Sequence, residues 1–325
     1  MNVVSVSRRT DIPALYWPWF RGRLEAGYCH VVNPFNARQV YRVSLLPQDV
    51  IAFVFWTRFA GSLVRDAAVL AQRGYSFVVL HTLTGYPPLL EPNAPRFETA
   101  VRTLVELSAA TSPERVVWRY DPIILSTLTP AAYHVERFAE IAGRLAGAVQ
   151  RVIISFYDTY EHSQRRLARL TRATDVSFAT GTLAQRASLA RQLAQIASAH
   201  GMSLATCAEP ELAQAGLEPG RCVDPVLLQS VRPDLELHLR RAPTRAGCGC
   251  AESVDIGAYD TCTFACAYCY AVRSAPRATL HHREHDPHDS LLWRPPDLRG
   301  VDLDDPSVES VDRVPRAAPA RRSMT

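Results

Sequence analysis

Lysine is absent from this chain of 325 residues, so all 36 basic side chains are arginines. The net charge is only +4, and the arginines form no stripe with interleaved aromatic residues. A basic surface built for nucleic acid or phosphate is therefore not favoured. A genome rich in G and C, whose codons favour arginine, is the simpler explanation of this composition.

Long apolar runs are absent as well. No segment has the length that a membrane span needs, and the start "MNVVSVSRRTDIP" has no apolar core of the kind found in signal peptides. Eight cysteines are too few for a disulfide scaffold in a chain of this length. We therefore expect a cytoplasmic protein without a membrane partner, in which clustered cysteines serve a metal or catalysis.

Short β-prone runs alternate with longer segments of helical periodicity. Residues 135–150 and 183–200 place apolar side chains three and four positions apart, as amphipathic helices do. Such alternation indicates parallel β/α units, about eight of which build a complete or partial TIM-like barrel. We predict this fold, with an open doubly wound sheet as the alternative. The expected strands are Val3–Ser7, Ile51–Trp56, Ser76–Leu80, Val116–Trp118, Val152–Ser155, Val176–Phe178, Met202–Thr206 and Val254–Ile256.

One domain is expected to span residues 1–285. Within it, residues 29–45 predict an inserted hairpin around the turn "NPFN", and residues 248–270 form a cysteine-rich loop. Residues 286–325 are rich in Pro, Asp and Arg and show no periodicity. They predict a coil that packs locally around residues 291–293 and ends in a disordered tail.

Polar residues follow six of the expected strands. The carboxyl ends of parallel barrel strands meet at one face, so these residues predict a polar pocket there. Arg119, Asp121 and Glu209 are its candidate catalytic residues. The alternative is that strand ends are polar only because loops are solvated. The residues concerned are Ser7 to Asp11, Thr57, Arg58, His81, Thr82, Thr84, Arg119, Asp121, Ser155, Asp158, Cys207 and Glu209.

The stretch "YDTCTFACAYCYA" contains the densest group of thiols, Cys262, Cys266 and Cys269. Zinc sites usually use paired C-x2-C knuckles and four ligands. Three cysteines at spacings of four and three residues are more typical of a [4Fe–4S] cluster, which prefers thiolates. Three protein ligands would leave one iron open to a small chelating ligand.

This spacing, with an aromatic residue before the last cysteine, resembles the signature of radical S-adenosylmethionine (SAM) enzymes. The resemblance implies that Cys262, Cys266 and Cys269 hold the cluster and that SAM chelates the open iron. It also implies that Tyr268 packs beside the adenine and that ferredoxin or flavodoxin donates the electron. The run "YCYA" at residues 268–271 is similar to the corresponding stretch of spore photoproduct lyase.

The chain as a whole resembles an uncharacterised bacterial family, domain of unknown function 1848, over about residues 3–293. That family is described only as carrying a radical-SAM-like cysteine cluster at its C-terminal end. The shared sequence motifs are "SRRTDIPA" (7–14), "NPFN" (33–36), "FWT" (55–57), "TLTGY" (82–86), "WRYDPI" (118–123), "CAE" (207–209) and "DIGAYDTC" (255–262).

Two departures from radical SAM enzymes stand out. Ala265 occupies the position before the middle cysteine where those enzymes usually have glycine. Their cysteine loop follows the first barrel strand, whereas here it follows the last. A circularly permuted barrel reconciles the two orders, and it places residues 254–256 beside residues 3–7.

Four further cysteines, Cys207, Cys222, Cys248 and Cys250, could form a second site for an iron–sulfur cluster or zinc. Their spacing matches no standard knuckle, and buried thiols without a ligand are the alternative. Cys29 is expected to be a small core residue.

Three functions remain open. The first is a radical SAM enzyme with a [4Fe–4S] cluster and SAM, acting on a nucleic acid, a peptide or a small metabolite. The second is a zinc- or cluster-stabilised barrel, a hydrolase or binding protein without radical chemistry. The third is an iron–sulfur redox sensor or electron carrier, which would need a fourth protein ligand such as Cys250.

Overall fold

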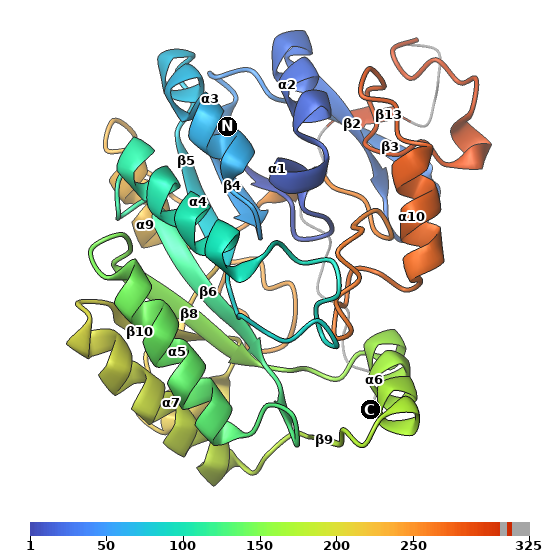
Figure 1. Ribbon diagram of the computed structural model, residues 1–325. Coiled ribbons are helices and arrows are strands. Elements are labelled where there is room, and N and C mark those ends of the chain that lie inside the picture. The colour runs from blue at the N-terminus through green and yellow to red at the C-terminus, as the bar shows by residue number, and fades with distance from the viewer. Residues whose placement is uncertain (306–310, 314–325) are drawn as a thin grey trace.

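The computed structural model describes residues 1–305 and 311–313. Its centre is a sheet of eight parallel strands in the order β11-β10-β8-β6-β5-β4-β1-β12, curled into a half-barrel (Figure 1). This is the partial β/α barrel that the sequence predicts. The strands are β1 (Asn2–Val6), β4 (Val50–Thr57), β5 (Phe77–Thr82), β6 (Val116–Ile123), β8 (Arg151–Phe156), β10 (Ser203–Cys207), β11 (Pro219–Gly220) and β12 (Val254–Asp255).

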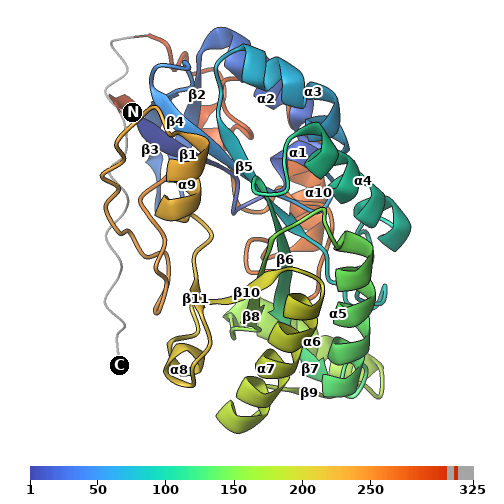
Figure 2. The ribbon, with the colours of Figure 1, turned by 90° about the vertical axis from the view of Figure 1, so that its left-hand side faces the viewer.

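Four long helices cover the outer face of the sheet, each beside the next (Figure 2). They are α3 (Gly61–Gln72), α4 (Phe97–Ala110), α5 (Ala131–Leu145) and α7 (Leu183–Ala199). Every residue of β4 is buried, which explains its continuous apolar run. Phe53 and Phe55 pack in the core under the helices, whereas Ala52 and Val54 belong to the core inside the curl.

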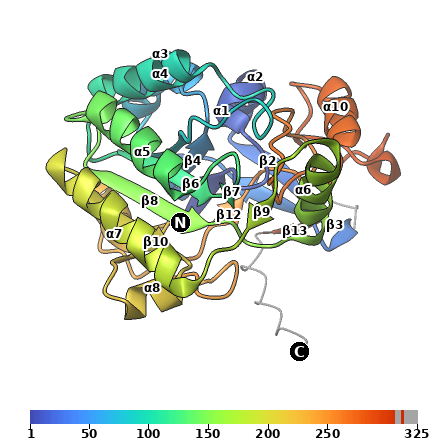
Figure 3. The ribbon, with the colours of Figure 1, turned by 60° about the horizontal axis from the view of Figure 1, so that its bottom comes forward.

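Inside the half-barrel, the inward-facing side chains of the strands belong to one apolar core. There α9 (Pro225–Val231) packs Leu227 and Leu228 against Val54 and Val78. The carboxyl ends remain open to the cysteine-rich loop, and Figure 3 shows the curled sheet with the long helices outside it. This arrangement leaves room for a site at the carboxyl ends of the strands.

The two edges of the sheet differ from the rest. β12 pairs with β1 through Val4–Val254 and Ser5–Asp255, so the expected neighbourhood of these segments is confirmed. β11 at the other edge has only two residues and was not predicted. The strand predicted at 176–178 is wrong as a barrel strand, because this short and partly exposed run reaches no strand of the sheet. Instead β9 (Phe178–Ala179) pairs with β7 (Leu125–Ser126) in a separate antiparallel pair.

The predicted hairpin is present as β2 (Tyr28–Asn33) and β3 (Asn36–Ser44). β13 (Val311–Arg313) adds a parallel strand to β3, and Leu291 packs with Val40 and Leu298 beside it. The rest of the predicted tail, residues 306–310 and 314–325, lies outside the described residues. None of the described helices is long and apolar enough to cross a membrane. The remaining helices are α1 (Ile12–Leu15), α2 (Trp17–Ala26), α6 (Glu161–Ala173), α8 (Pro210–Gln214), α10 (Ala275–Arg283) and the 3₁₀ helix η1 (Pro296–Leu298).

Candidate functional site

A cavity of about 410 Å³ opens at the carboxyl ends of the strands. Its size is within the range of ligand pockets, roughly 300–1,000 Å³. Most of the polar residues predicted to meet at this face line it, whereas His81, Thr84 and Glu209 do not. The predicted residues that line it are Ser7 to Asp11, Thr57, Arg58, Thr82, Arg119, Asp121, Ser155, Asp158 and Cys207.

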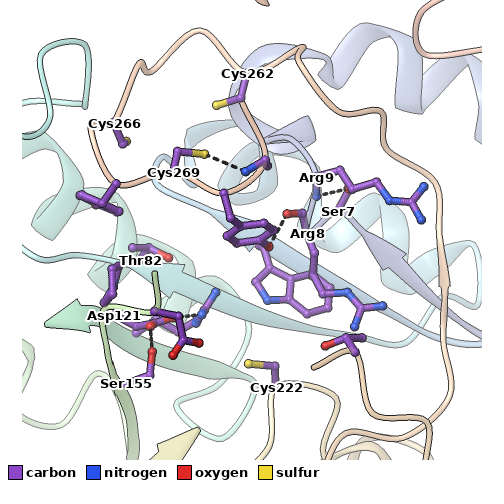
Figure 4. A pocket seen from close by; sticks show the side chains of 18 of the residues that line it. Ser7, Arg8, Arg9, Thr82, Asp121, Ser155, Cys222, Cys262, Cys266 and Cys269 are labelled. Carbon is purple, nitrogen blue, oxygen red and sulfur yellow. Dashed lines mark hydrogen bonds and ion pairs between the residues drawn. The ribbon is translucent and has the colours of Figure 1, made fainter. Parts of the chain in front are cut away.

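Cys262, Cys266 and Cys269 lie together on the loop above these strand ends, and all three line the cavity (Figure 4). Burial raises the pKa of Cys262 well above its ordinary value and that of Cys266 to about 12. The thiols are therefore neutral until a positively charged centre displaces their protons.

Backbone N–H groups already point at two of these sulfurs. The N–H of Ala271 donates to the Cys269 sulfur at 3.3 Å. The N–H of Val272 likewise favours the thiolate of Cys269, and the N–H of Phe264 favours that of Cys262. Hydrogen bonds of this kind stabilise thiolates and set the electronic properties of the iron–sulfur clusters that they bind.

The cysteine loop is fastened from two sides. The Arg166 guanidinium on α6 donates to the carbonyl oxygens of Ala267 at 2.9 Å and Val272 at 2.6 Å, and also to that of Cys269. On the other side, the Asn93 amide donates to the Thr263 carbonyl at 2.9 Å. The loop thus has a fixed course, although it contains no helix or strand.

Ala265, at the position of the usual glycine, has a φ of 57°. This left-handed conformation costs an alanine about 1–2 kcal/mol relative to the ordinary backbone. A glycine would adopt this backbone conformation more easily.

Among the described residues, no group of three or more His, Cys, Asp or Glu side chains is arranged to hold a single metal ion. A cubane makes a different demand, because each of its cysteines binds a separate iron atom. Three sulfurs on one ordered loop, all facing one cavity, meet that demand in donor chemistry and placement.

Tyr268 is fixed at the cavity wall by charged groups. Its hydroxyl hydrogen-bonds with both Glu91 and Arg58, which pair with each other at 2.9 Å. Thr84 donates to the same Glu91 oxygen at 2.7 Å. The ring, which is only 7% exposed, is therefore held rigidly beside the cysteine loop.

Arg119 and Asp121 form an ion pair that faces the cavity, as the strand-end pattern predicts. The Ser155 hydroxyl donates to Asp121. The Arg119 Nε atom is buried and has no hydrogen-bond partner in the described part of the chain.

Of two buried carboxylates at this site, Asp11 belongs to the predicted run Ser7 to Asp11, whereas Asp255 was not singled out from the sequence. Asp11 accepts hydrogen bonds from the Thr57 hydroxyl at 2.8 Å and the Arg58 N–H at 2.7 Å, and burial raises its pKa to about 6. Asp255 accepts from the Ser7 hydroxyl at 2.6 Å and pairs with Arg8. The adjacent arginines at positions 8 and 9 were the only hint of a buried acidic partner.

Two polar residues lie elsewhere than expected. Glu209 lies outside the cavity, where it accepts a 2.7 Å bond from the Phe156 N–H and pairs with Arg186 at 3.3 Å. It anchors the end of β8. His81 is fully buried away from the cavity, and burial lowers its pKa to about 3.

The structure also gathers Cys207, Cys222, Cys248 and Cys250 at the wall opposite the cysteine loop, where Figure 4 labels Cys222. Cys250 contacts Cys222 and Cys248 in this group. Seven of the eight cysteines therefore line one cavity, and the buried Cys29 is elsewhere, in the core.

The fold and site define a parallel β/α half-barrel protein with a cysteine-lined cavity at the carboxyl ends of its strands. The chain matches the family described as a domain of unknown function, DUF1848, over residues 3–271, and it belongs to that family. A comparison with curated proteins found no match.

Proposed function

We propose that the protein is a radical SAM-type enzyme that holds a [4Fe–4S] cluster through Cys262, Cys266 and Cys269. One observation carries the proposal: three thiols on one fastened loop line a ligand-sized cavity, and backbone N–H groups favour the thiolates of two of them.

When bound and reduced, such a cluster supplies the electron that splits SAM into methionine and a 5′-deoxyadenosyl radical. The chain's own residues position what binds there. Arg166 holds the loop, and Arg119, which lines the cavity, supplies a positive charge for the carboxylate of SAM or of a substrate. Tyr268, held by Glu91 and Arg58, offers a rigid ring for the adenine.

The pairing of β12 with β1 supports a circular permutation relative to radical SAM barrels. The cysteine loop follows β12, whose neighbour is the first strand of this chain. The loop thus lies at the strand end next to β1, although it is encoded after all the other strands of the sheet.

Anaerobic reconstitution tests the proposal. The protein should take up about four irons and four sulfides per chain. With dithionite and SAM it should release 5′-deoxyadenosine, and SAM should change the electron paramagnetic resonance spectrum of the reduced cluster. A reducible cluster that SAM does not perturb and that transfers no electron to SAM would overturn the proposal.

The physiological donor in this scheme is a ferredoxin or flavodoxin, and the substrate is a nucleic acid, a peptide or a small metabolite. An electron carrier would instead need a fourth cysteine at the loop. Cys250 lies with Cys222 and Cys248, so replacing it should leave the reconstituted cluster intact. Loss of the cluster in Cys250→Ala would favour the redox protein.

A further inference from the structure

Four cysteines outside the loop come from three separate segments. Cys207 ends β10, Cys222 follows β11, and Cys248 and Cys250 lie on one turn. Each is at most 8% exposed. Isolated buried thiols are common as small core residues, so burial alone implies no ligand.

The thiols contact one another in a row. The Cys207 and Cys222 sulfurs are 3.5 Å apart. Cys250 hydrogen-bonds with Cys222 on one side and with Cys248 on the other. Four thiols in a row, each in contact with its neighbours, are a different arrangement from ordinary core packing.

Hydrogen-bond donors converge on the sulfurs. The Val223 N–H donates to the Cys250 sulfur at 3.5 Å, and the Cys250 N–H donates to the Cys248 sulfur at 3.5 Å. The Thr244 hydroxyl reaches the Cys248 sulfur at 3.7 Å. Neutral thiols need no such donors, whereas metal-bound thiolates gain from each of them.

Positive charge also surrounds the group. Arg8 is close enough to interact electrostatically with Cys222 and Cys250, Arg119 with Cys222, and Arg245 with Cys248 and Cys250. A metal ion bound by four thiolates carries a net charge of about −2, counted from its ligands. Arginines at the wall balance that charge.

We propose that Cys207, Cys222, Cys248 and Cys250 bind one zinc ion, separate from the iron–sulfur cluster. In a tetrahedral thiolate site, Zn–S bonds of about 2.3 Å place the sulfurs about 3.8 Å apart. The separation of 3.5 Å between Cys207 and Cys222 is close to this edge. A cubane would hold its cysteines on different irons and therefore farther apart.

The free thiols do not yet form a closed site, in keeping with the lack of any preformed single-ion group among the described residues. Cys207 and Cys248 are the ends of the row, so zinc binding requires these two side chains to move toward Cys222 and Cys250. Four thiols would release their protons as the ion binds.

Zinc here would hold together a poorly structured part of the chain. Between β10 and β12 the longest regular element is α9, with seven residues, and residues 232–253 contain no helix. One ion would join both ends of this segment to β10 and stiffen the cavity wall. Structural zinc sites stabilise folds in this way.

The test uses the full chain with Cys262, Cys266 and Cys269 all replaced by alanine, so that the first cluster cannot form. Metal analysis of this triple variant should find about one zinc per chain. Cobalt added to the zinc-free triple variant should give the charge-transfer and red visible bands typical of tetrahedral thiolate coordination. Adding Cys222→Ala or Cys248→Ala should abolish both signals, whereas adding Cys29→Ala, the matched buried cysteine, should preserve them.

Iron and sulfide bound to the triple variant would mean a second iron–sulfur cluster and would overturn the zinc assignment. Absence of both zinc and a cobalt spectrum would overturn the site itself. If the Cys222 variant does not fold, the cobalt titration of the triple variant still decides. Chelation should also increase proteolysis within residues 208–253. An unchanged cleavage pattern would contradict the proposal that zinc stabilises this segment. None of these results depends on SAM cleavage.

Discussion

The two cysteine groups face one cavity but are built in opposite ways. Cys262, Cys266 and Cys269 come from one loop, and their spacing alone suggests a shared ligand. Cys207, Cys222 and the pair at 248 and 250 meet only because β10, β11 and a later turn fold together. The first group is therefore a local motif, whereas the second is a product of tertiary structure.

Their surroundings differ as well. Both signs of charge act on the loop, where Arg58 favours and Glu91 opposes the thiolate of Cys266, and Asp11 opposes that of Cys262. The charged neighbours of the second group are arginines, which favour its thiolates.

The largest expected effect is that of Cys266→Ala. It should remove the reconstituted cluster and with it all SAM cleavage, because two remaining thiolates hold a cubane poorly. Iron and sulfide analysis measures the loss. Cys29→Ala should retain full iron content. An intact cluster in Cys266→Ala would mean that the loop is not a separate cluster site, distinct from the second cysteine group.

Arg166→Leu should come next, because it removes three bonds from one guanidinium to the loop backbone. We expect the free energy of unfolding to fall by about 2–4 kcal/mol, which is less than three bonds at about 1.5–3 kcal/mol each, because the guanidinium is partly exposed and water replaces part of what is lost. The neighbouring Arg165 is exposed and pairs with Glu161. Arg165→Leu should therefore change stability by about 0.5 kcal/mol or less. Equal effects in chemical denaturation would show that Arg166 does not fasten the loop.

The buried Asp11, beside the cysteine loop, predicts that the free energy of unfolding depends on pH. Burial raises its folded pKa from 3.8 to about 6, so its contribution to stability is complete below pH 3.8 and is lost as the pH rises through 6. This loss is on the order of 2–3 kcal/mol. In Asp11→Asn the corresponding slope between pH 4 and 7 should vanish from the unfolding free energy. An unchanged slope would contradict the assignment.

The smallest effect concerns two alanines with left-handed backbone, Ala265 in the loop and Ala208 beside Cys207, with φ of 57° and 56°. Glycine at either position should raise stability by roughly 1 kcal/mol. Ala267→Gly, at a buried loop position whose φ is not positive, should lower it by a similar amount. Thermal unfolding distinguishes the outcomes, and a loss at both positions would mean that the strain is compensated elsewhere.

Periodicity predicted most of the barrel, because buried strands and amphipathic helices carry their pattern in the sequence. It could not predict β11, a Pro-Gly pair that is a strand only through its contact with β10. The barrel strand predicted at residues 176–178 was wrong because these residues are β-prone but have no partner in the sheet.

The sequence predicted those site residues that directly follow a barrel strand, because the end of the strand fixes where their side chains lie. Arg119 and Asp121 extend from a strand into the cavity, as expected. Glu209 was predicted to line the cavity but does not, because Ala208, in its left-handed conformation, turns the chain just before it. Arg166 carried no signal, since an arginine on an amphipathic helix resembles any solvated residue until the loop folds against it.

The pairing of β1 with β12 joins residues 250 positions apart, as between Val4 and Val254. A ribosome releases the N-terminus first, so one edge of β1 stays unpaired while six further strands of the sheet are made before β12. Every cysteine of the cavity leaves the ribosome after residue 206. Under the proposed function, the cluster could therefore be assembled only after the last strand of the sheet, β12, has been made, because Cys262, Cys266 and Cys269 follow it in the chain.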